Sequence, residues 1–332
     1  MVRLDIRNVS GRRELNAASD LCEPSLKPQH VTILLNASSG TAARAKQDDL
    51  RARLDAGFRK HEISTSIEFV PGSELQTVAE RAVEDAAAGK TDAVIAGGGD
   101  GTIRTVAGAL AGKDIRLGVL PLGTLNHFAK DLRIPLALDD AIEVIAAGTS
   151  RAVDVGAVNE EIFINNSSIG IYPFLVLDRE RRQAYSGLSK WPAMFLAGLR
   201  AVRNLPVRRL RIRARDWQEA VRSPCVFIGN NRYDLEGGSF GSRQQLDAGE
   251  LCLYVAKRQG RLALLWLAVK CVLGIEDQRD LRIVTLDVLE VDSRRKKLLV
   301  AFDGEIRLMR TPLRYRTRPA ALQVFAPLPS GP

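Results

Sequence analysis

Residues 97–102 read Gly-Gly-Gly-Asp-Gly-Thr, a composition that suits the binding of phosphate groups. They follow an apolar run, residues 93–96, that predicts a short buried strand, and they precede a helical pattern that begins near Ile103. Glycines have no Cβ, so a ligand can approach their backbone N–H groups closely. The N-terminus of the following helix adds unpaired N–H donors and partial positive charge. The pattern therefore predicts a phosphate-binding turn.

Asp100 stands in the middle of this turn, where its carboxylate would repel a phosphate group. Its presence indicates a metal partner, a base or a group that orients other groups. The alternative is a tight strand-to-helix turn with no ligand. Four glycines around a central acid favour phosphate binding, but the spacing fits neither the P-loop nor the dinucleotide-binding fingerprint.

Strand and helix patterns alternate over residues 31–148, which indicates βαβ units and a parallel, doubly wound sheet. Such sheets bind ligands at the carboxyl ends of their strands. Two more turns of small polar residues, 36–41 and 121–126, also follow predicted strands. We therefore expect the three turns to lie at the same edge of one sheet.

Beyond residue 150 the pattern changes to short strands rich in β-branched and aromatic residues, which predict an antiparallel sandwich as a second domain. One of these strands ends in Asp303-Gly304-Glu305, whose two carboxylates suit a base or a metal site. An ordinary Asp-Gly hairpin turn is the alternative. The predicted organisation is an extension, an α/β domain and a β-sandwich over residues 1–29, 30–150 and 151–307.

The whole chain has the length of a two-domain protein, 332 residues, and the composition of a soluble globular protein. No apolar run approaches the ~20 residues needed to span a bilayer, and the N-terminus lacks a signal-peptide pattern, so we expect a cytoplasmic protein. A net charge of +9 suits nucleic acid, phosphate ligands or acidic lipid headgroups. Few aromatic residues (5%) and no recognised module argue against nucleic acid.

The basic residues concentrate over residues 179–215, where a solvated basic face is the simplest interpretation. Two predicted helices in the second half carry aromatic residues that could contact a membrane interface, although core packing is the more common role. These helices and aromatic residues are 179–202, 262–273, Trp191, Phe195 and Trp266.

Taken in order, these elements resemble the diacylglycerol kinase catalytic domain, and more closely the bacterial soluble lipid kinases related to diacylglycerol and sphingosine kinases. The matching elements are the turn Asn36-Ala37-Ser38-Ser39-Gly40, the glycine turn, the turn Pro121-Leu122-Gly123-Thr124-Leu125-Asn126 and Asp303-Gly304-Glu305. Their order and spacing match over about residues 30–327. The glycine turn alone is shared with NAD kinases and phosphofructokinases.

The resemblance implies an N-terminal three-layer α/β domain and a C-terminal β-sandwich, with ATP bound between them. It also implies that the last strands, about residues 308–327, return to the first domain. The implied reaction is transfer of the γ-phosphoryl group of ATP, with Mg²⁺, to a lipid hydroxyl such as that of diacylglycerol or a sphingoid base. The lipid would be met by peripheral contact with a membrane.

Carried over by position, the resemblance implies that Glu305 is the proton acceptor and that Asp100 and Asp303 organise Mg²⁺ and the hydroxyl. The family also binds a structural Mg²⁺, and the resemblance implies that Asp247 would be its ligand here. Ala248 stands where the family has an aspartate. The residues that would contact the nucleotide are Asn36, Ser39, Gly98, Gly99, Asp100, Gly101, Thr102, Ile103, Arg104, Thr124 and Asn126.

Two other functions stay open. An NAD kinase-like or other small-molecule kinase would share the glycine turn, but the Pro-Leu-Gly-Thr-Leu-Asn turn argues against it. A non-catalytic relative would bind lipid or nucleotide without turnover, and retention of Asp100 and Glu305 argues against that. His127, where the family often has an aspartate, could alter the acceptor side. The sequence does not identify the acceptor lipid or the oligomeric state.

Overall fold

The structure is a computed structural model that describes seven stretches of the chain: 27–37, 41–170, 208–215, 217–223, 225–234, 242–256 and 281–327. Some sequence predictions lie outside these stretches. They are the extension up to residue 26, the nucleotide contact of Ser39, and the helices predicted over 179–202 and 262–273 with their aromatic residues.

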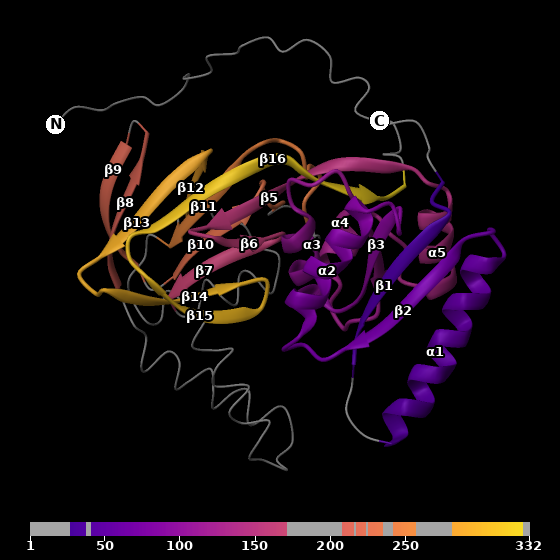
Figure 1. The fold of residues 1–332 in the computed structure, drawn as a ribbon. Helices are drawn as coiled ribbons and strands as arrows, with labels where there is room; N and C mark the ends of the chain where they lie inside the picture. Colours follow the sequence, from indigo (N-terminus) through magenta and orange to yellow (C-terminus); the bar gives the residue numbers. More distant parts are fainter. Residues whose placement is uncertain are drawn as a thin grey trace, which may run out of the picture.

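In the first half of the described chain, strands and helices alternate as predicted (Figure 1). The strands are continuous apolar runs because helices cover both faces of a parallel sheet, and in β1 all residues from 31 to 35 are buried. The elements are β1 (His30–Asn36), α1 (Thr41–Arg59), β2 (Ser64–Val70), α2 (Leu75–Ala87), β3 (Ala93–Gly98), α3 (Asp100–Leu110), β4 (Arg116–Pro121), α4 (His127–Asp131) and α5 (Leu138–Ala146).

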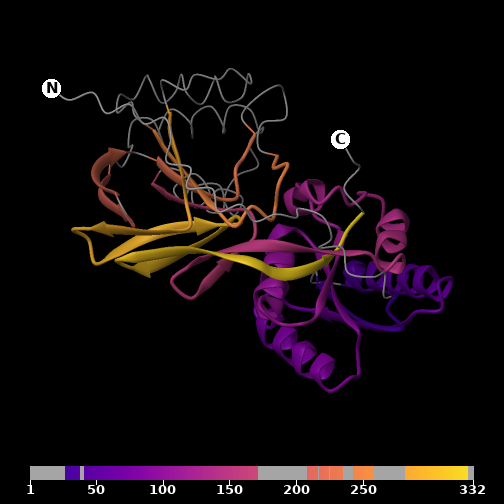
Figure 2. The same cartoon turned by 90° about the horizontal axis from the view of Figure 1, so that it is seen from above.

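The helices form two layers around the parallel strands. Helix α1 packs against α5, and α2 packs against α3, on opposite faces of the sheet (Figure 2). The side chains between them form one continuous apolar core. The predicted three-layer α/β arrangement is therefore confirmed. None of the helices in the described part of the chain has the length and apolar character of a membrane-crossing helix.

The second half of the described chain contains only strands, which confirms the predicted change to all-β structure. Six of them form an antiparallel sheet in the order β12-β11-β10-β7-β14-β15. The strands are β5 (Ser150–Val158), β6 (Glu161–Phe163), β7 (Asn166–Gly170), β8 (Arg208–Ala214), β9 (Trp217–Ser223), β10 (Cys225–Asn230), β11 (Leu251–Ala256), β12 (Leu281–Leu286), β13 (Val288–Ser293), β14 (Lys297–Phe302), β15 (Glu305–Arg310) and β16 (Leu313–Phe325).

The long strand β16 joins the two halves. It pairs in parallel with β4 and antiparallel with β5 and β13. One sheet therefore runs from β2 at one edge, through β1, β3, β4, β16, β13 and β8, to β9 at the other. Its β16-β13-β8 part faces the six-stranded sheet across a second apolar core. The predicted domain boundaries stay a prediction, since one continuous sheet crosses them.

The carboxyl ends of β1, β3 and β4 lie side by side. Leu35 pairs with Gly97, and Gly98 pairs with Pro121. The glycine turn and the turn of residues 121–126 therefore lie at one edge of the sheet, beside the end of β1, as the βαβ pattern predicts.

Asp154 of β5 holds an irregular part of β16 in place. The pairing of β5 with β16 shifts between Arg318 and Leu322, and Ala320 in this shift has a left-handed φ of 49°. The buried carboxylate of Asp154 accepts the Ala320 N–H at 2.8 Å and the Gly249 N–H at 2.6 Å. A charged residue inside an apolar strand thus anchors two neighbouring turns.

We predict that Asp154→Ala lowers the free energy of unfolding by about 3 kcal/mol, because several donors lose a charged acceptor in a buried site. Urea denaturation checks this value. The matched control is Asp114→Ala at an exposed position, which should change stability by less than about 0.5 kcal/mol. Equal effects of the two substitutions would contradict the anchoring role of Asp154.

Candidate active site

The N-terminus of α3 is open. Helix α3 begins at Asp100 after Gly99, and no side chain caps it. The first backbone N–H to bond back to the preceding turn is that of Ile103, which donates to the Gly99 oxygen at 3.1 Å. The N–H groups before it lack intrahelical partners and favour an anion. Such a helix terminus can bind a phosphate group, and the phosphate binding predicted from residues 97–102 stays a prediction.

The glycine turn and the turn of residues 121–126 touch backbone to backbone. The Leu122 N–H donates to the Gly98 oxygen at 3.1 Å. A Cβ placed on Gly123 would lie 2.4 Å from the Gly99 Cα, closer than any side chain allows. Glycine is therefore needed at 123 so that the two turns pack together.

Asn126 closes the second turn with its own amide. It adopts a left-handed φ of 50° and accepts the Gly123 N–H at 3.0 Å. Its Nδ2 donates to the Gly123 oxygen at 2.9 Å and to the Pro121 oxygen at 3.2 Å. Because this buried amide is satisfied inside the turn, the predicted nucleotide contact of Asn126 stays a prediction, and its visible role is to shape the loop.

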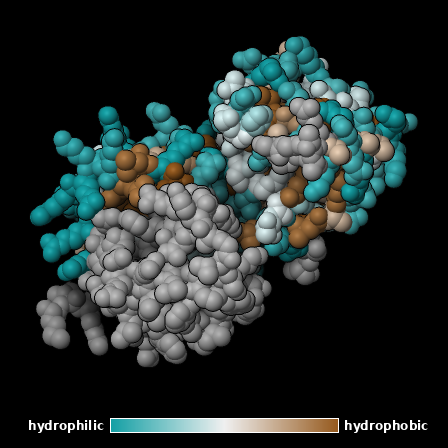
Figure 3. Space-filling model, turned by 90° about the horizontal axis from the view of Figure 1, so that it is seen from below, coloured by the Kyte–Doolittle hydropathy of each residue, from teal (hydrophilic) through white to brown (hydrophobic). Residues whose placement is uncertain are grey.

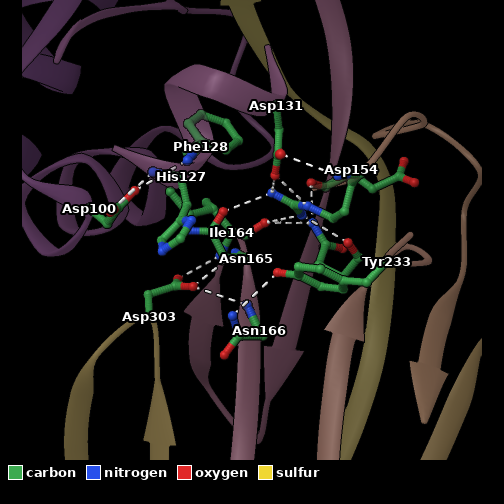
Figure 4. Close-up of polar contacts among 12 residues, drawn as sticks. Asp100, His127, Phe128, Asp131, Asp154, Ile164, Asn165, Asn166, Tyr233 and Asp303 are labelled. Carbon is green, nitrogen blue, oxygen red and sulfur yellow. Dashed lines mark hydrogen bonds and ion pairs between the residues drawn. The ribbon is translucent and has the colours of Figure 1, made fainter. Parts of the chain in front are cut away.

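The Asp100 carboxylate faces α4 instead of the open end of α3. Its two oxygens accept the N–H groups of His127 and Phe128 at 3.3 Å and 3.2 Å (Figure 4). These are the first N–H groups of α4, where a negative charge is favourable. Asp100 therefore orients the neighbouring helix, which was one of the three roles that its position in the sequence suggested.

Glu305 lies beside α3, although the two are far apart in sequence. Its Oε2 forms an ion pair with Arg104 at 2.6 Å, and a Cβ on Gly101 would lie 3.6 Å from its Oε1. The Arg104 side chain is 7% exposed and that of Glu305 is 41% exposed. A fixed guanidinium thus holds a carboxylate that a substrate can still reach.

Asp303 and Gly304 form the hairpin turn between β14 and β15, with φ values of 46° and 86°. Positive φ at both positions is the backbone that an Asp-Gly hairpin favours. The turn predicted as an alternative to a functional site is therefore present, and it also places Glu305 at the start of β15.

The Asp303 carboxylate is buried and points into the second half of the molecule. It accepts the N–H groups of Ile164, Asn165 and Asn166 at 2.7, 2.8 and 3.1 Å (Figure 4). Burial raises the pKa of Asp303 to about 6, although the three N–H donors and Arg104 act in the opposite direction. These contacts fix the hairpin that carries Glu305.

Arg243 links α4 to the all-β half. Its guanidinium is fully buried and pairs with Asp131 at 2.8 Å. It also donates to the backbone oxygens of Ile164 and Asn230, both at 2.8 Å, and to Oδ1 of Asn165 at 2.7 Å. All of its donors are used, so the position of Asp131 at the end of α4 is tightly fixed.

Tyr233 completes the surroundings of Arg243, whose guanidinium lies 5.4 Å from the centre of the ring. Burial disfavours the charged form of Arg243, but the neighbouring Tyr233 and Asp131 outweigh it, and the pKa of Arg243 is raised. Burial also raises the pKa of Asp131, although Arg243 acts in the opposite direction. Arg243 and Asp131 therefore form a buried ion pair in which their mutual attraction offsets part of the cost of removing both charges from water.

Other predicted site residues have simpler surroundings. Thr124 and Asn36 are exposed, at the second turn and at the end of β1. Thr102 is packed against Gly98, and Ile103 belongs to the apolar core, so Ile103 can offer a ligand only its backbone. Asp247 is exposed, and the described residues contain no group of three His, Cys, Asp or Glu side chains that could hold a metal ion.

Sequence reasoning missed Asp131, Arg243, Asn165 and Asp154. Asp154 carried a usable signal, because a carboxylate inside the apolar strand 152–158 requires a partner. The pair of Asp131 and Arg243 carried none, since its members are 112 residues apart and each resembles an ordinary surface charge.

Comparisons with known proteins identify similar chains. Residues 30–158 match the family model described as the diacylglycerol kinase catalytic domain. The chain is 36% identical over 180 residues to a probable lipid kinase YegS-like protein of Citrobacter koseri, covering 52% of this chain and 57% of that protein. It is 38% identical over 161 residues to the probable lipid kinase YegS of Escherichia coli, covering 46% and 52%.

The matched region thus spans little more than half of these relatives. A solved structure described as a diacylglycerol kinase from Bacillus anthracis has a TM-score of 0.63 at 19% identity, covering 91% of this chain and 98% of that chain. Another Bacillus anthracis structure has a TM-score of 0.69 at 23% identity, which indicates a shared fold. Residues 30–158 are therefore similar to the diacylglycerol kinase catalytic domain, which the ordered turns also resemble.

We predict that Arg243→Ala lowers the free energy of unfolding by about 3–5 kcal/mol, because Asp131 is left charged and buried without a partner. Urea denaturation measures the change, and a double-mutant cycle with Asp131→Asn should show strong coupling. As a control, Arg53→Ala breaks the exposed pair of Arg53 with Asp139, 4.0 Å apart, and should cost less than about 1 kcal/mol. Independent, additive effects at 131 and 243 would contradict the assigned pair.

Proposed function

We propose that this protein is a lipid kinase that transfers the γ-phosphoryl group of ATP to a lipid hydroxyl. The observation that carries the proposal is the ion pair between Arg104 and Glu305. It joins a carboxylate that can accept a proton to the helix whose open N-terminus suits phosphate. Enzymes of this chemistry act mainly by positioning the phosphate chain and the attacking hydroxyl, so this arrangement supports the assignment.

The phosphate side of the site rests on two features. The backbone N–H groups at the start of α3 are available to anionic oxygens. The Nε of Arg104 is buried and has no hydrogen-bond partner among the described residues. A buried donor without a partner is unfavourable, so this nitrogen suits a phosphate oxygen that enters the site. We assign nucleotide binding to this face of residues 98–104, with Thr124 and Asn36 at its margins.

The chemistry proposed for Glu305 is proton acceptance. The lipid hydroxyl oxygen forms a bond to the γ-phosphorus while the bond from that phosphorus to the bridging oxygen of ADP breaks. The hydroxyl proton passes to the Glu305 carboxylate and then to water. Arg104 holds this carboxylate in place, and the exposure of Glu305 allows a hydroxyl to reach it.

The phosphates of the nucleotide would supply most of the ligands for Mg²⁺ at this site. Asp100 and Asp303 accept backbone N–H groups, which leaves Glu305 as the carboxylate nearest to α3 without such contacts. Mg²⁺ commonly binds through substrate phosphates, waters and one or two carboxylates, and it neutralises charge on the phosphate chain. We therefore propose that Asp100 and Asp303 position the site, while the triphosphate and Glu305 would hold the ion.

The acceptor side favours an apolar substrate. Leu122 and Leu125 are 40% and 56% exposed in the turn that also presents Thr124. Exposed leucines beside a polar phosphate site suit a lipid better than the polar nucleotide NAD. We propose a cytoplasmic enzyme that meets its lipid by peripheral contact with a membrane.

The direct test is incubation of the protein with labelled ATP and Mg²⁺, with diacylglycerol, a sphingoid base or phosphatidylglycerol in mixed micelles, and with NAD in a separate reaction. Thin-layer chromatography identifies the labelled product. Label on a lipid supports the proposal. Label on NAD instead would show that the protein is a small-molecule kinase. If the folded protein transfers no label, it binds lipid or nucleotide without turnover.

We predict that Glu305→Gln lowers kcat by about 10²–10⁴-fold, because the neutral amide cannot accept the proton. The affinity for ATP measured without Mg²⁺ should change little, since the substitution leaves the start of α3 intact. Steady-state kinetics and ATP titration check both statements. The control is Glu84→Gln on the exposed side of α2, which should behave like the wild type. Unchanged turnover in Glu305→Gln would remove the proposed role.

We predict that Gly123→Ala raises the Kd for ATP more than about tenfold, because the new methyl group forces the second turn away from Gly99. Gly72→Ala is the matched control, since a Cβ on Gly72 has no atom within 4 Å. Isothermal titration measures both variants. Equal affinities in the two would show that contact between the turns does not shape the nucleotide site.

A further inference from the structure

Four arginines surround a hollow on the outer face of the ten-stranded sheet, at the end opposite to the α/β half. They are Arg209 and Arg211 of β8, Arg222 of β9 and Arg294, and the hollow has a volume of about 450 Å³. Asp292 is the one carboxylate among the lining residues. Figure 3 shows hydrophilic side chains projecting from this end of the molecule.

The strands place these arginines on one face. Leu210 and Ile212 point into the core, so the alternating residues Arg209 and Arg211 point outward. Across to β9, Arg209 pairs directly with Arg222 and Arg211 pairs with Ala220. The small side chain of Ala220 leaves the space between the long arginines, which accounts for the hollow.

The arrangement is unfavourable in the absence of a ligand. Like charges directly opposite each other in a sheet destabilise the pairing, and Arg209 faces Arg222 in this way. Within the described residues, none of the four arginines forms an ion pair. The next arginine along β8 differs, because Arg213 pairs with Glu290 at 2.7 Å.

Asp292 offers little compensation. It lies opposite Arg211 in the sheet, but one of its oxygens accepts the N–H of Ser293 at 2.7 Å. The next three residues, Arg295, Lys296 and Lys297, are also basic and exposed. Positive charge therefore accumulates around the hollow well beyond what its one carboxylate can balance.

We propose that this hollow is a binding site for a phosphate group. Guanidinium groups bind phosphate oxygens through two parallel hydrogen bonds, and several of them around a concave surface can hold one dianion or a row of headgroups. The phosphate is carried either by an anionic phospholipid or as the free ion. The site is separate from the proposed active site and does not depend on kinase activity.

The test compares the wild type with Arg209→Gln/Arg211→Gln/Arg222→Gln. The matched control, Arg53→Gln/Arg59→Gln/Lys60→Gln, removes the same charge from two exposed positions of α1 and from the exposed residue that follows it. One arm measures sedimentation with vesicles of phosphatidylcholine containing about one third phosphatidylglycerol. The other arm measures thermal stabilisation by inorganic phosphate against chloride at equal ionic strength. Melting temperatures without ligand show that each variant is folded.

The hollow variant should bind the vesicles on the order of 100-fold more weakly than the wild type, because each arginine near an anionic surface contributes about fivefold. The affinity of the control variant for the vesicles should fall far less. If the hollow variant loses vesicle binding but keeps the thermal stabilisation by inorganic phosphate, the phosphate belongs to a lipid headgroup. If it loses both, the site binds the free phosphate ion. Equal losses in the two variants, or no binding by the wild type in either arm, would overturn the proposal. Binding of a DNA duplex alone would overturn it in favour of nucleic acid.

Discussion

The buried contact between Arg243 and Asp131 is the constraint on which the candidate site depends. Two charges removed from water are stable only when their remaining hydrogen-bonding groups are satisfied, and Arg243 satisfies this condition with Asn165 and two backbone oxygens. Asp131 is the last residue of α4, whose first N–H groups are held by Asp100. This short helix is therefore fixed at both ends, by the glycine turn on one side and by the all-β half on the other.

The same strategy recurs on the opposite side of the site. Asp303 holds the N–H groups of residues 164–166, and Arg243 binds the Ile164 oxygen and the Asn165 side chain. The hairpin that carries Glu305 and the helix that follows the second turn are thus attached to one segment. In the proposed reaction the rigid groups are the buried ones, and the group that meets the substrate, Glu305, stays partly exposed. Such a division suits a reaction in which positioning is the main contribution of the protein.

Local patterns in the sequence were enough to predict the parallel sheet, the position of the glycine turn and of the turn 121–126 at one edge, and the change to strands after residue 150. They succeeded because glycine turns, apolar strand runs and amphipathic helices depend on neighbours in sequence. They could not by themselves reveal that β16 joins both halves in one sheet, although the resemblance implied that the last strands return to the first domain. They also could not reveal that Asp100 and Asp303 bind backbone N–H groups. Those outcomes depend on contacts between distant segments, and Arg243 has no local feature that distinguishes it from a surface arginine. The ordered set of turns, through family resemblance, supplied the proposed function.

Amide hydrogen exchange in Arg243→Gln tests the central claim most directly. If Arg243 fixes α4 and the segment 164–166 together, exchange should accelerate both at Asn166, held by Asp303, and at His127 and Phe128, held by Asp100. Amides of β1 and β3, which have no contact with Arg243, should exchange as in the wild type. Faster exchange confined to residues bonded directly to position 243, with His127, Phe128 and Asn166 unchanged, would contradict the account.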